Sequence, residues 1–342
     1  MSARTPEQAG RARAGRRSMA EHARPHPVFV IPFFADHPRQ CRFLEQTVES
    51  LVMQSDPEWE AIVVDDASPM ETAPVLAAVR EQAGGKVHAV RHAGNRGPGA
   101  CRNTGTEWAA ARGAPFILFQ DADDLADPDR LRATRRHFDT RPATDMVYSA
   151  FEVVDENGEP VPYGDITPSV AEIVDSHAAG PVEGPDAWIP IATATGYTTL
   201  TSTVAVRTTV AVAHPFPSGH ASEDTHAWLR MLAGGGELGF LKDVVARYRV
   251  ARDTEGSASR ARMGESFYWR MLQLDLDGFV RAAALSVARG RIGAEEVPEL
   301  LRRFHLKQAE TMAAEGQDDA AETCRSLAHT FMDPARNGEA AP

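Results

Sequence analysis

The sequence predicts an α/β fold: a doubly wound, largely parallel sheet with helices on both faces, followed by a helical C-terminal region. Short apolar runs alternate with segments of helical periodicity through the first 140 residues, which is typical of successive strand and helix units. The runs are apolar at successive positions, as in strands buried on both faces. Polar clusters directly follow several of these runs, as expected at the carboxyl edge of a parallel sheet.

The first half of the chain contains four predicted strand and helix units. The strands are expected at residues 28–34, 60–64, 87–90 and 116–119. The helices are expected at residues 38–54, 71–82, 98–112 and 128–138. Pro98 follows a glycine-rich turn and suits the first position of its helix, because proline has no backbone N–H to leave unpaired there.

The second half is less regular. A hairpin is expected at residues 146–161, with Asn157 and Gly158 at its turn. Residues 167–190 are expected to form loops and short helices that line a substrate site. The next elements are expected to be a strand at 199–206, a helix at 222–232 with Ser222 as its N-cap, and a strand at 237–249. Beyond residue 263 the pattern is helical, with breaks near residues 290–293 and 316.

The two ends of the chain differ from its body. Residues 1–27 hold six arginines against two glutamates and no apolar segment, which predicts a disordered leader. Residues 333–342 are predicted to form a disordered tail. The whole chain has a formal net charge of −12, and the leader is positive, so the body is strongly acidic. This charge argues against a nucleic-acid partner, and an anionic ligand would need a local cation or helix N-termini.

Composition also indicates a compartment. No apolar run approaches the roughly 20 residues that a membrane-spanning helix needs, so no integral membrane segment is expected. The three cysteines, Cys41, Cys101 and Cys324, are odd in number and widely spaced, which favours a reducing environment over a disulfide framework. We therefore expect a cytoplasmic location, with peripheral attachment to the inner membrane as the alternative. The sequence does not indicate an oligomeric state.

Three carboxylates follow the fourth predicted strand. Asp121, Asp123 and Asp124 lie within four residues and repel one another unless a cation neutralises them. In an extended or turning segment Asp121 and Asp123 point the same way, and their oxygens suit a hard divalent ion. A solvated turn before the next helix explains the same spacing equally well.

Five segments, in this order, resemble the family 2 glycosyltransferases, enzymes of the GT-A fold that transfer a sugar from a nucleotide donor. They are VIPFF (30–34), VVDDAS (63–68), NRGPGACRNTG (95–105), FQDADD (119–124) and SEDTHAWLRM (222–231). Each segment alone is weak evidence, but all five in order are specific. The resemblance implies a nucleotide-sugar-binding half at 28–140, an acceptor-binding half at 141–260 and a C-terminal helical region at 261–332.

The resemblance also implies roles on the donor side. A divalent cation, Mn²⁺ or Mg²⁺, would assist departure of the nucleotide diphosphate. Asp123, the second aspartate of the DxD motif, would be the principal ligand, with Asp121 contacting the ribose or the water shell of the metal. Asp66 would hold the nucleobase edge, and Asp65 would serve the same pocket. The other expected donor-binding residues are Pro32, Phe33, Asn95, Arg102 and Asn103. A surface salt bridge is the alternative for Arg102.

The later acidic pair would supply the base. By this resemblance Asp224 takes the proton from the acceptor, and Glu223 orients the acceptor or the site. Acids are also favoured in the first turn of a helix by its dipole, which is the alternative for both. The implied reaction is a hexosyltransferase-type transfer of one sugar from a nucleotide diphosphate sugar, with UDP favoured. The acceptor group would be a hydroxyl or an amine, and the anomeric configuration would invert.

The sequence departs from the family pattern at one point. Many relatives carry a histidine after the strand that ends here in Arg249, but this chain has none, so Arg249, Arg252 or Ser257 would replace its diphosphate contact. The chain also lacks a QxxRW-like motif, which favours single additions over processive synthesis.

Two other functions remain open. One is a catalytically inactive GT-A-like protein that only binds a nucleotide. The other is an aspartate-nucleophile phosphatase, although that class normally places its DxD after the first strand of the fold. The sequence identifies neither the donor sugar nor the acceptor.

Overall fold

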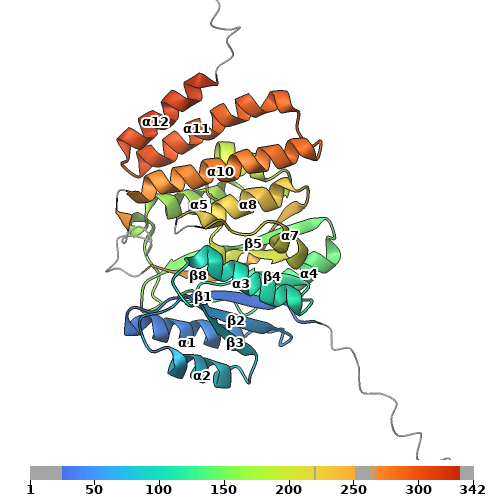
Figure 1. Cartoon of the computed structure of the whole chain (residues 1–342), viewed down its shortest axis with the longest axis vertical. Coiled ribbons are helices and arrows are strands. Elements are labelled where there is room, and N and C mark those ends of the chain that lie inside the picture. Colours follow the sequence, from blue (N-terminus) through green and yellow to red (C-terminus); the bar gives the residue numbers. More distant parts are fainter. Residues whose placement is uncertain (1–24, 219–220, 251–262, 265, 332–342) are drawn as a thin grey trace, which may run out of the picture.

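The computed structural model describes residues 25–218, 221–250, 263–264 and 266–331 (Figure 1). Most of the predicted leader, the predicted tail, Arg252 and Ser257 lie outside these ranges. The described chain forms a mixed α/β structure with a mostly parallel central sheet, which confirms the predicted fold class.

The first half alternates between strands and helices as predicted. Its strands are β1 (Val28–Phe33), β2 (Glu60–Asp65), β3 (Val87–Arg91) and β4 (Phe116–Phe119). Its helices are α1 (Pro38–Val52), α2 (Ala73–Gln82), α3 (Pro98–Ala111) and α4 (Arg130–Thr140). The strands lie in the order β3-β2-β1-β4 and are all parallel, so their carboxyl ends meet along one edge.

The second half completes an eight-stranded sheet of order β3-β2-β1-β4-β7-β5-β8-β6. Strand β7 (Ala205–Arg207) lies antiparallel between β4 and β5 (Thr144–Val154). Strand β8 (Glu237–Arg249) runs parallel to β5, and the short β6 (Gly184–Pro185) forms the edge. The helices here are α5 (Pro168–Ala179), α6 (Trp188–Pro190), α7 (Thr208–Ala213) and α8 (Glu223–Ala233).

The apolar strands are buried on both faces. In β1, Val28 and Val30 belong to a core shared with α3 and α8, whereas Phe29 and Ile31 belong to a second core shared with α1, α2 and α4. Successive side chains of a strand point to opposite faces, so continuous apolar runs are what this arrangement requires. Helix α3 packs closely on β1, because a Cβ at Gly105 would lie 2.4 Å from Cγ1 of Val30.

Three predictions for the second half hold only in part. The chain turns back at Asn157–Gly158 as predicted, with backbone bonds from residue 155 to 159 and from 161 to 153, but the returning arm is short and β5 pairs mainly with β7 and β8. The expected strand at 199–206 begins with a 3₁₀ turn, Thr201–Thr203, stabilised by hydroxyl-to-carbonyl bonds that compete with a strand ladder. Ser222 occupies the N-cap position of α8 but makes no side-chain capping bond.

The C-terminal helices stack at one end of the molecule (Figure 1). They are α10 (Ser266–Ala288), α11 (Val297–Ala314) and α12 (Asp318–Thr330). Gly290 and Gly316 have positive φ values of 66° and 70°, so both predicted breaks are confirmed where only glycine turns the backbone cheaply. None of the helices in the described part of the chain combines the length and hydropathy needed to cross a bilayer.

Candidate active site

A cavity of about 510 Å³ opens at the carboxyl edge of β1, β2 and β4. Its other walls are the first turns of α3 and α8, the end of β8, and residues from α5, α10 and α11. Most of the site residues expected from the sequence line it: Pro32, Phe33, Asp66, Asn95, Arg102, Asp121, Asp123, Glu223 and Asp224. Asp65 and Asn103 do not.

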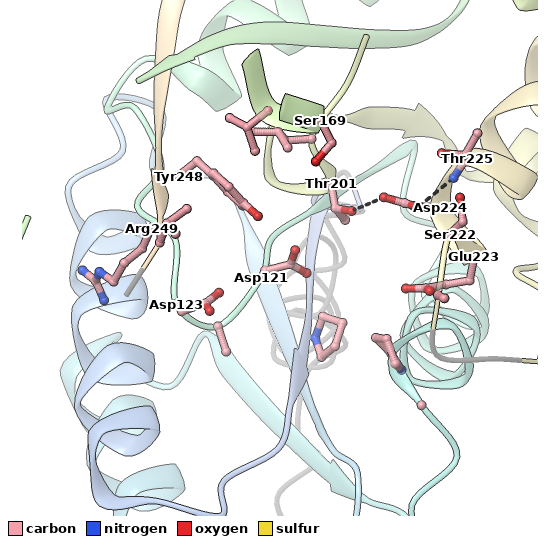
Figure 2. A pocket seen from close by; sticks show the side chains of 18 of the residues that line it. Asp121, Asp123, Ser169, Thr201, Ser222, Glu223, Asp224, Thr225, Tyr248 and Arg249 are labelled. Atoms are coloured by element: carbon pink, nitrogen blue, oxygen red, sulfur yellow. Dashed lines mark hydrogen bonds between the residues drawn. The ribbon is translucent and has the colours of Figure 1, made fainter. Parts of the chain in front are cut away.

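Asp121 and Asp123 face this cavity from the turn after β4 (Figure 2). Asp121 accepts a hydrogen bond of 2.9 Å from Arg102, and its backbone N–H donates to Ser202 Oγ at 2.9 Å. The surrounding protein, which displaces water, and the charge of Asp121 together raise the pKa of Asp123. Two carboxylates that repel each other at a pocket wall are a donor set that a hard divalent cation fits.

The third acid of the cluster has a different role. Asp124 is 1% exposed and accepts hydrogen bonds from Ser202 Oγ and, at 2.8 Å, from the backbone N–H of Arg249. These contacts tie the turn after β4 to the end of β8. The cluster therefore divides into two acids that face the cavity and one that holds the turn in place.

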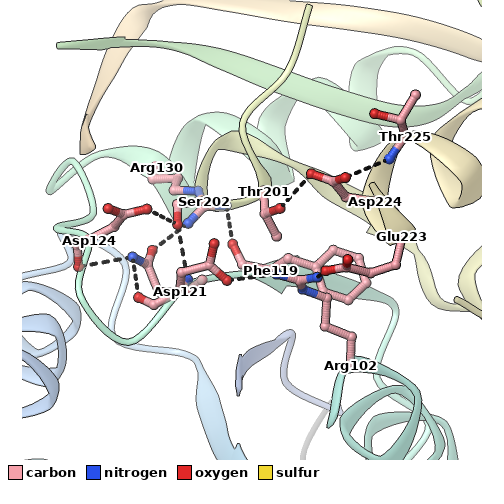
Figure 3. Close-up of polar contacts among 11 residues, drawn as sticks. Arg102, Phe119, Asp121, Asp124, Arg130, Thr201, Ser202, Glu223, Asp224 and Thr225 are labelled. Carbon is pink, nitrogen blue, oxygen red and sulfur yellow. Dashed lines mark hydrogen bonds and ion pairs between the residues drawn. The ribbon is translucent and has the colours of Figure 1, made fainter. Parts of the chain in front are cut away.

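Arg102 joins the two acidic motifs of the site (Figure 3). Its guanidinium donates to Glu223 Oε1 at 2.7 Å and to Asp121 Oδ1 at 2.9 Å, and the side chain is almost fully buried. Burial opposes the charged form, but the carboxylates of Asp121 and Glu223 outweigh it and raise the pKa of Arg102. Arg102 therefore does not form a surface salt bridge, and removal of either acid would leave part of a buried charge uncompensated.

Glu223 and Asp224 begin α8 on the opposite side of the cavity from Asp123 (Figure 2). Glu223 is 7% exposed; burial raises its pKa, against the stabilising charge of Arg102. Asp224 accepts a bond of 3.3 Å from Thr201 Oγ1 and one of 2.8 Å from the backbone N–H of Thr225. Glu223 is thus committed to Arg102, whereas both partners of Asp224 are uncharged.

Asp65 and Asp66 both contact the scaffold. Asp65 is fully buried outside the cavity and accepts hydrogen bonds from Ser68, Thr72 and Arg91, a placement that does not fit the expected role in the nucleoside pocket. Asp66 lines the cavity. Its carboxylate oxygens accept hydrogen bonds of 2.7–3.0 Å from the backbone N–H groups of residues 96 and 97, and one of them lies 2.7 Å from Nδ1 of His92. Asp66 therefore fixes the loop that leads into α3.

A buried group of possible metal ligands adjoins this loop. Asp66, His92 and Cys101 place one ligand atom each within 4.8 Å of one another. However, the oxygens of Asp66 are already engaged, and burial together with the charge of Asp66 raises the pKa of the Cys101 thiol well above its ordinary value. A metal ion here would have to displace the bonds that Asp66 makes to the loop before α3, so we assign this group to the scaffold.

Asn103 shapes the site from outside the cavity. Its amide donates to the carbonyl of Phe216 at 2.9 Å and accepts from the backbone N–H of the same residue at 2.8 Å. The ring of Phe216 lies under the Arg102 guanidinium, with 5.5 Å between the central carbon and the ring centroid. Asn103 thus positions an aromatic partner of Arg102.

Arg249 is the basic residue at the end of β8 that lines the cavity. It is 7% exposed, its guanidinium lies 4.1 Å from the ring centroid of Phe43, and burial lowers its pKa. Two of its nitrogens, Nε and Nη1, have no hydrogen-bond partner among the described residues. Buried donors without partners are costly, so they mark a place where an anion would be stabilised.

The sequence placed residues 167–190 at a substrate site, and Val170 and Ile173 of α5 do line the cavity. Sequence reasoning did not identify several other residues of the wall: Thr201, Tyr197, Tyr248 and the side chains of α10, including Phe267, Tyr268 and Met271. Adjacent aromatic residues at 267 and 268, just before a long helix, are a weak signal because the same pattern occurs in any helical core. Only the folded chain shows that α10 reaches the cavity.

Comparisons with known proteins agree with this geometry. Residues 29–197 match the family model for glycosyl transferase family 2. A segment of 102 residues, 30% of this chain and 30% of its relative, is 32% identical to the succinoglycan biosynthesis protein ExoW of Rhizobium meliloti. The chain thus spans about a third of the length of this curated relative.

Two solved structures share the architecture. S. aureus TarS, residues 1–349, superposes with a TM-score of 0.54 at 18% identity, covering 93% of each chain. The same part of TarS is also known in complex with UDP-GlcNAc. A mannosyltransferase from Pyrobaculum calidifontis, in complex with GDP-Man and Mn²⁺, superposes with a TM-score of 0.53 at 18% identity over 93% of this chain and 82% of that one. These likenesses show the GT-A fold, and the family match identifies residues 29–197 as a family 2 glycosyltransferase domain.

Proposed function

We propose that the protein transfers a single hexose from a nucleotide diphosphate sugar to a hydroxyl or amine of an acceptor, with inversion of the anomeric configuration. The observation that carries this proposal is the cavity itself. Asp121 and Asp123 lie on one side of it, Asp224 lies on the other, and Arg102 joins the two acidic motifs. A leaving group and an attacking group need this separation, because displacement with inversion occurs from opposite faces of the sugar.

The donor side would bind a nucleotide diphosphate together with Mn²⁺ or Mg²⁺. Asp123 and Asp121 would hold the cation, which supplies electrophilic stabilisation of the departing diphosphate. Arg249, with two unpaired buried nitrogens at the cavity wall, would bind the diphosphate in place of the missing histidine. We favour UDP over GDP, although the structural neighbours include complexes with each.

The opposite side would supply the base. Asp224 would accept the acceptor proton, because among the described residues its carboxylate is engaged by Thr201 and a backbone N–H, neither of which is charged. Glu223 would act on the site rather than on the acceptor, since its carboxylate is bound to Arg102. The charge of Arg102 would in turn hold Asp121 in the donor wall.

Asp66 would act through the loop it holds. Residues 95, 97 and 98 line the cavity, and the oxygens of Asp66 accept from the backbone N–H groups of residues 96 and 97. A nucleobase bound here would lie against this loop, so loss of Asp66 would weaken nucleoside binding more than the chemical step.

A nucleotide-binding relative without activity is the remaining alternative, and it is less well supported because the predicted base and the predicted metal ligands all face one cavity. The phosphatase is not supported. Its DxD belongs after the first strand, whereas this motif follows the fourth strand of a domain that matches glycosyl transferase family 2.

A thermal-shift panel tests the proposal. UDP, GDP and TDP are each added with and without Mn²⁺, and we expect one of them to raise the melting temperature only when Mn²⁺ is present. A ligand at 100 times its dissociation constant stabilises a protein by about 2.7 kcal/mol. Asp123→Ala should abolish the Mn²⁺-dependent part of the shift and leave the ligand-free melting temperature within about a degree, because residue 123 faces the open cavity and is not packed in the core.

Glu152→Ala serves as the control, since this exposed acid pairs with Arg247 on the sheet and lies outside the cavity. Equal Mn²⁺-dependent shifts in the parent and in Asp123→Ala would contradict the metal site. No shift with any nucleotide would contradict the donor class.

A further inference from the structure

Asp275, a buried carboxylate on the C-terminal helix α10, accepts a hydrogen bond from Ser222, the residue that precedes the acidic pair of the site. Asp275 of α10 is 0% exposed, and three groups from different parts of the chain donate hydrogen bonds to it. The Ser222 hydroxyl donates to Oδ1, while the Tyr197 hydroxyl (2.8 Å) and the Gln308 amide (3.2 Å) donate to Oδ2. None of the three donors is a cation, so this carboxylate is held at the cost of removing it from water.

Ser222, which donates one of these bonds, has an unusual backbone conformation. Ser222 has φ 54° and ψ 23°, the left-handed conformation, and immediately precedes Glu223 and Asp224. This conformation costs a residue with a Cβ about 1–2 kcal/mol. The Ser222 hydroxyl does not cap α8, which is its ordinary use at this position, because it is directed to Asp275 instead.

Helix α10 is fixed against α8 at this point. Gly278 lies one turn beyond Asp275, and a Cβ there would be 2.7 Å from the Cα of His226. The neighbouring Asp277 bonds to His226 Nε2 at 2.8 Å. The backbones of the two helices are therefore nearly in contact, so Asp275 occupies a defined position relative to the first turn of α8.

We propose that Asp275 is a positioning residue for the transfer reaction. It holds Ser222 in the left-handed conformation, and this backbone sets the direction in which Glu223 reaches Arg102 and Asp224 faces the cavity. The inference rests on the proposed function for the role of Asp224. It extends the site beyond the matched family domain, residues 29–197, into the C-terminal helices.

Tyr197 ties the same carboxylate to the cavity wall. Its ring lines the cavity, and its hydroxyl donates to Asp275. The nearby charge of Asp224 also faces this cluster, since it contributes to the raised pKa of both Asp275 and Tyr197. Asp275 therefore organises two parts of the wall on which the acceptor would lie.

Second-site substitution at Ser222 tests the role of Asp275. Asp275→Ala should lower turnover of a UDP-sugar at least tenfold and reduce the Mn²⁺-dependent UDP shift much less, because Asp275 reaches the donor wall only indirectly, through Glu223 and Arg102. Glycine adopts positive φ at no steric cost, whereas alanine does not. The double variant Asp275→Ala/Ser222→Gly should therefore recover most of the lost turnover, and Asp275→Ala/Ser222→Ala should not.

Amide hydrogen exchange gives a readout that does not depend on activity. The amides of residues 223–226 should exchange at least tenfold faster in Asp275→Ala than in the parent, and the glycine double variant should restore protection. Ser222→Ala, which removes the same bond, covers the case in which Asp275→Ala does not fold, with the same direction of change expected. Glu322→Ala on α12, whose side chain is 70% exposed, is the control and should match the parent.

The comparison of glycine with alanine at position 222 shows whether Asp275 acts through the backbone of Ser222. If glycine and alanine at position 222 give equal turnover and equal exchange in the Asp275→Ala background, Asp275 does not act through the Ser222 backbone. Parental exchange at 223–226 in Asp275→Ala, or in Ser222→Ala if Asp275→Ala does not fold, would overturn the proposal as well, because each variant removes the bond between Ser222 and Asp275. A parent chain that turns over no nucleotide sugar contradicts the proposed function instead, and the exchange data still decide whether Asp275 positions this turn.

Discussion

The two sides of the cavity are built in different ways. The strand side comes from strand ends and the start of α3, and its members are Pro32, Asp66, Arg102, Asp121 and Asp123. The helical side comes from α5 and α10, and its members are Val170, Ile173, Phe267, Tyr268 and Met271. The strand side carries charged groups at most of these positions, whereas the helical side is mostly apolar, with Ser169 and the Tyr268 hydroxyl as polar exceptions.

This difference indicates how each side would select its ligand. Charged groups at the ends of parallel strands suit the binding of a diphosphate together with a cation. Different nucleotide diphosphate sugars share this part, so these groups need not differ between donors. Apolar side chains on packed helices select by shape, and they change from one chain to another without disturbing the sheet. Asp224 and Ser222 lie where the two sides meet, so variants there and on each side separate the contributions.

The largest expected effect on turnover is at Asp224, where the strand side and the helical side meet. Asp224→Asn should lower turnover by roughly 10²-fold or more, the usual scale for loss of a general base, and should retain Mn²⁺-dependent nucleotide binding. Turnover is measured as nucleotide diphosphate release and binding as a thermal shift. A larger loss in Glu223→Gln than in Asp224→Asn would reverse the assignment within the pair. A product that retains the anomeric configuration of the donor, seen by NMR, would exclude single displacement.

A pair of glycine substitutions should give smaller effects that separate the two sides. At Gly105 a Cβ would lie 2.4 Å from a Val30 side-chain carbon beneath α3, and at Gly278 it would lie 2.7 Å from the His226 backbone beneath α10. Each alanine variant should lose about 1–3 kcal/mol of unfolding free energy, the usual cost of overpacking. Gly105→Ala should also weaken nucleotide binding, whereas Gly278→Ala should lower turnover and leave nucleotide binding intact.

Denaturant melts give the stabilities, and thermal shifts give the binding. Gly158, in an open turn, has no atom within 4 Å of an added Cβ but has φ 85°, so Gly158→Ala controls for backbone strain without crowding. Loss of nucleotide binding in both variants would mean that the two sides are not separable.

The smallest expected effect is a pH dependence of the helical side. Burial raises the pKa of Asp275 to about 7 from an ordinary value of 3.8, against the hydrogen bonds from Ser222, Tyr197 and Gln308. The folded state therefore binds the proton more tightly than the unfolded state. Its contribution to stability is fully favourable below about pH 4 and is lost as the pH rises towards 7.

Chemical denaturation at pH 5 and pH 7.5 measures this effect. Asp275→Asn should remove part of the decrease in stability between the two values, because the amide does not titrate. An equal decrease in the parent and the variant would show that other groups account for it.

The sequence predicted the strand side better than the helical side, for a physical reason. Polar residues at parallel strand ends converge whatever the loops between them do, so the placement of Asp121 and Arg102 at one edge followed from strand order. Asp65, which was expected to serve the pocket, does not line the cavity, because adjacent residues at a strand end point to opposite faces and Asp66 is the one that faces it.

The helical side depends on packing between segments distant in sequence. Nothing in the local sequence around Asp275 distinguishes it from an acid on an exposed helix face, and its donors lie 78, 53 and 33 residues away. Ser222 shows the same limit. Its position before two acids predicts an N-cap, but a non-local partner takes its hydroxyl.

Because Ser222 is held by Asp275 of α10, one part of the site forms late during synthesis of the chain. Residues 29–197, the matched family domain, leave the ribosome before Asp275 exists in the nascent chain. Strand β7 completes the sheet between β4 and β5, and the end of β8 holds the turn after β4, so the strand side is complete only once Arg249 has been synthesised. At about 5–20 residues per second, Asp275 follows Arg249 by roughly one to five seconds. The turn that carries Asp224 is therefore among the last parts of the cavity to be held.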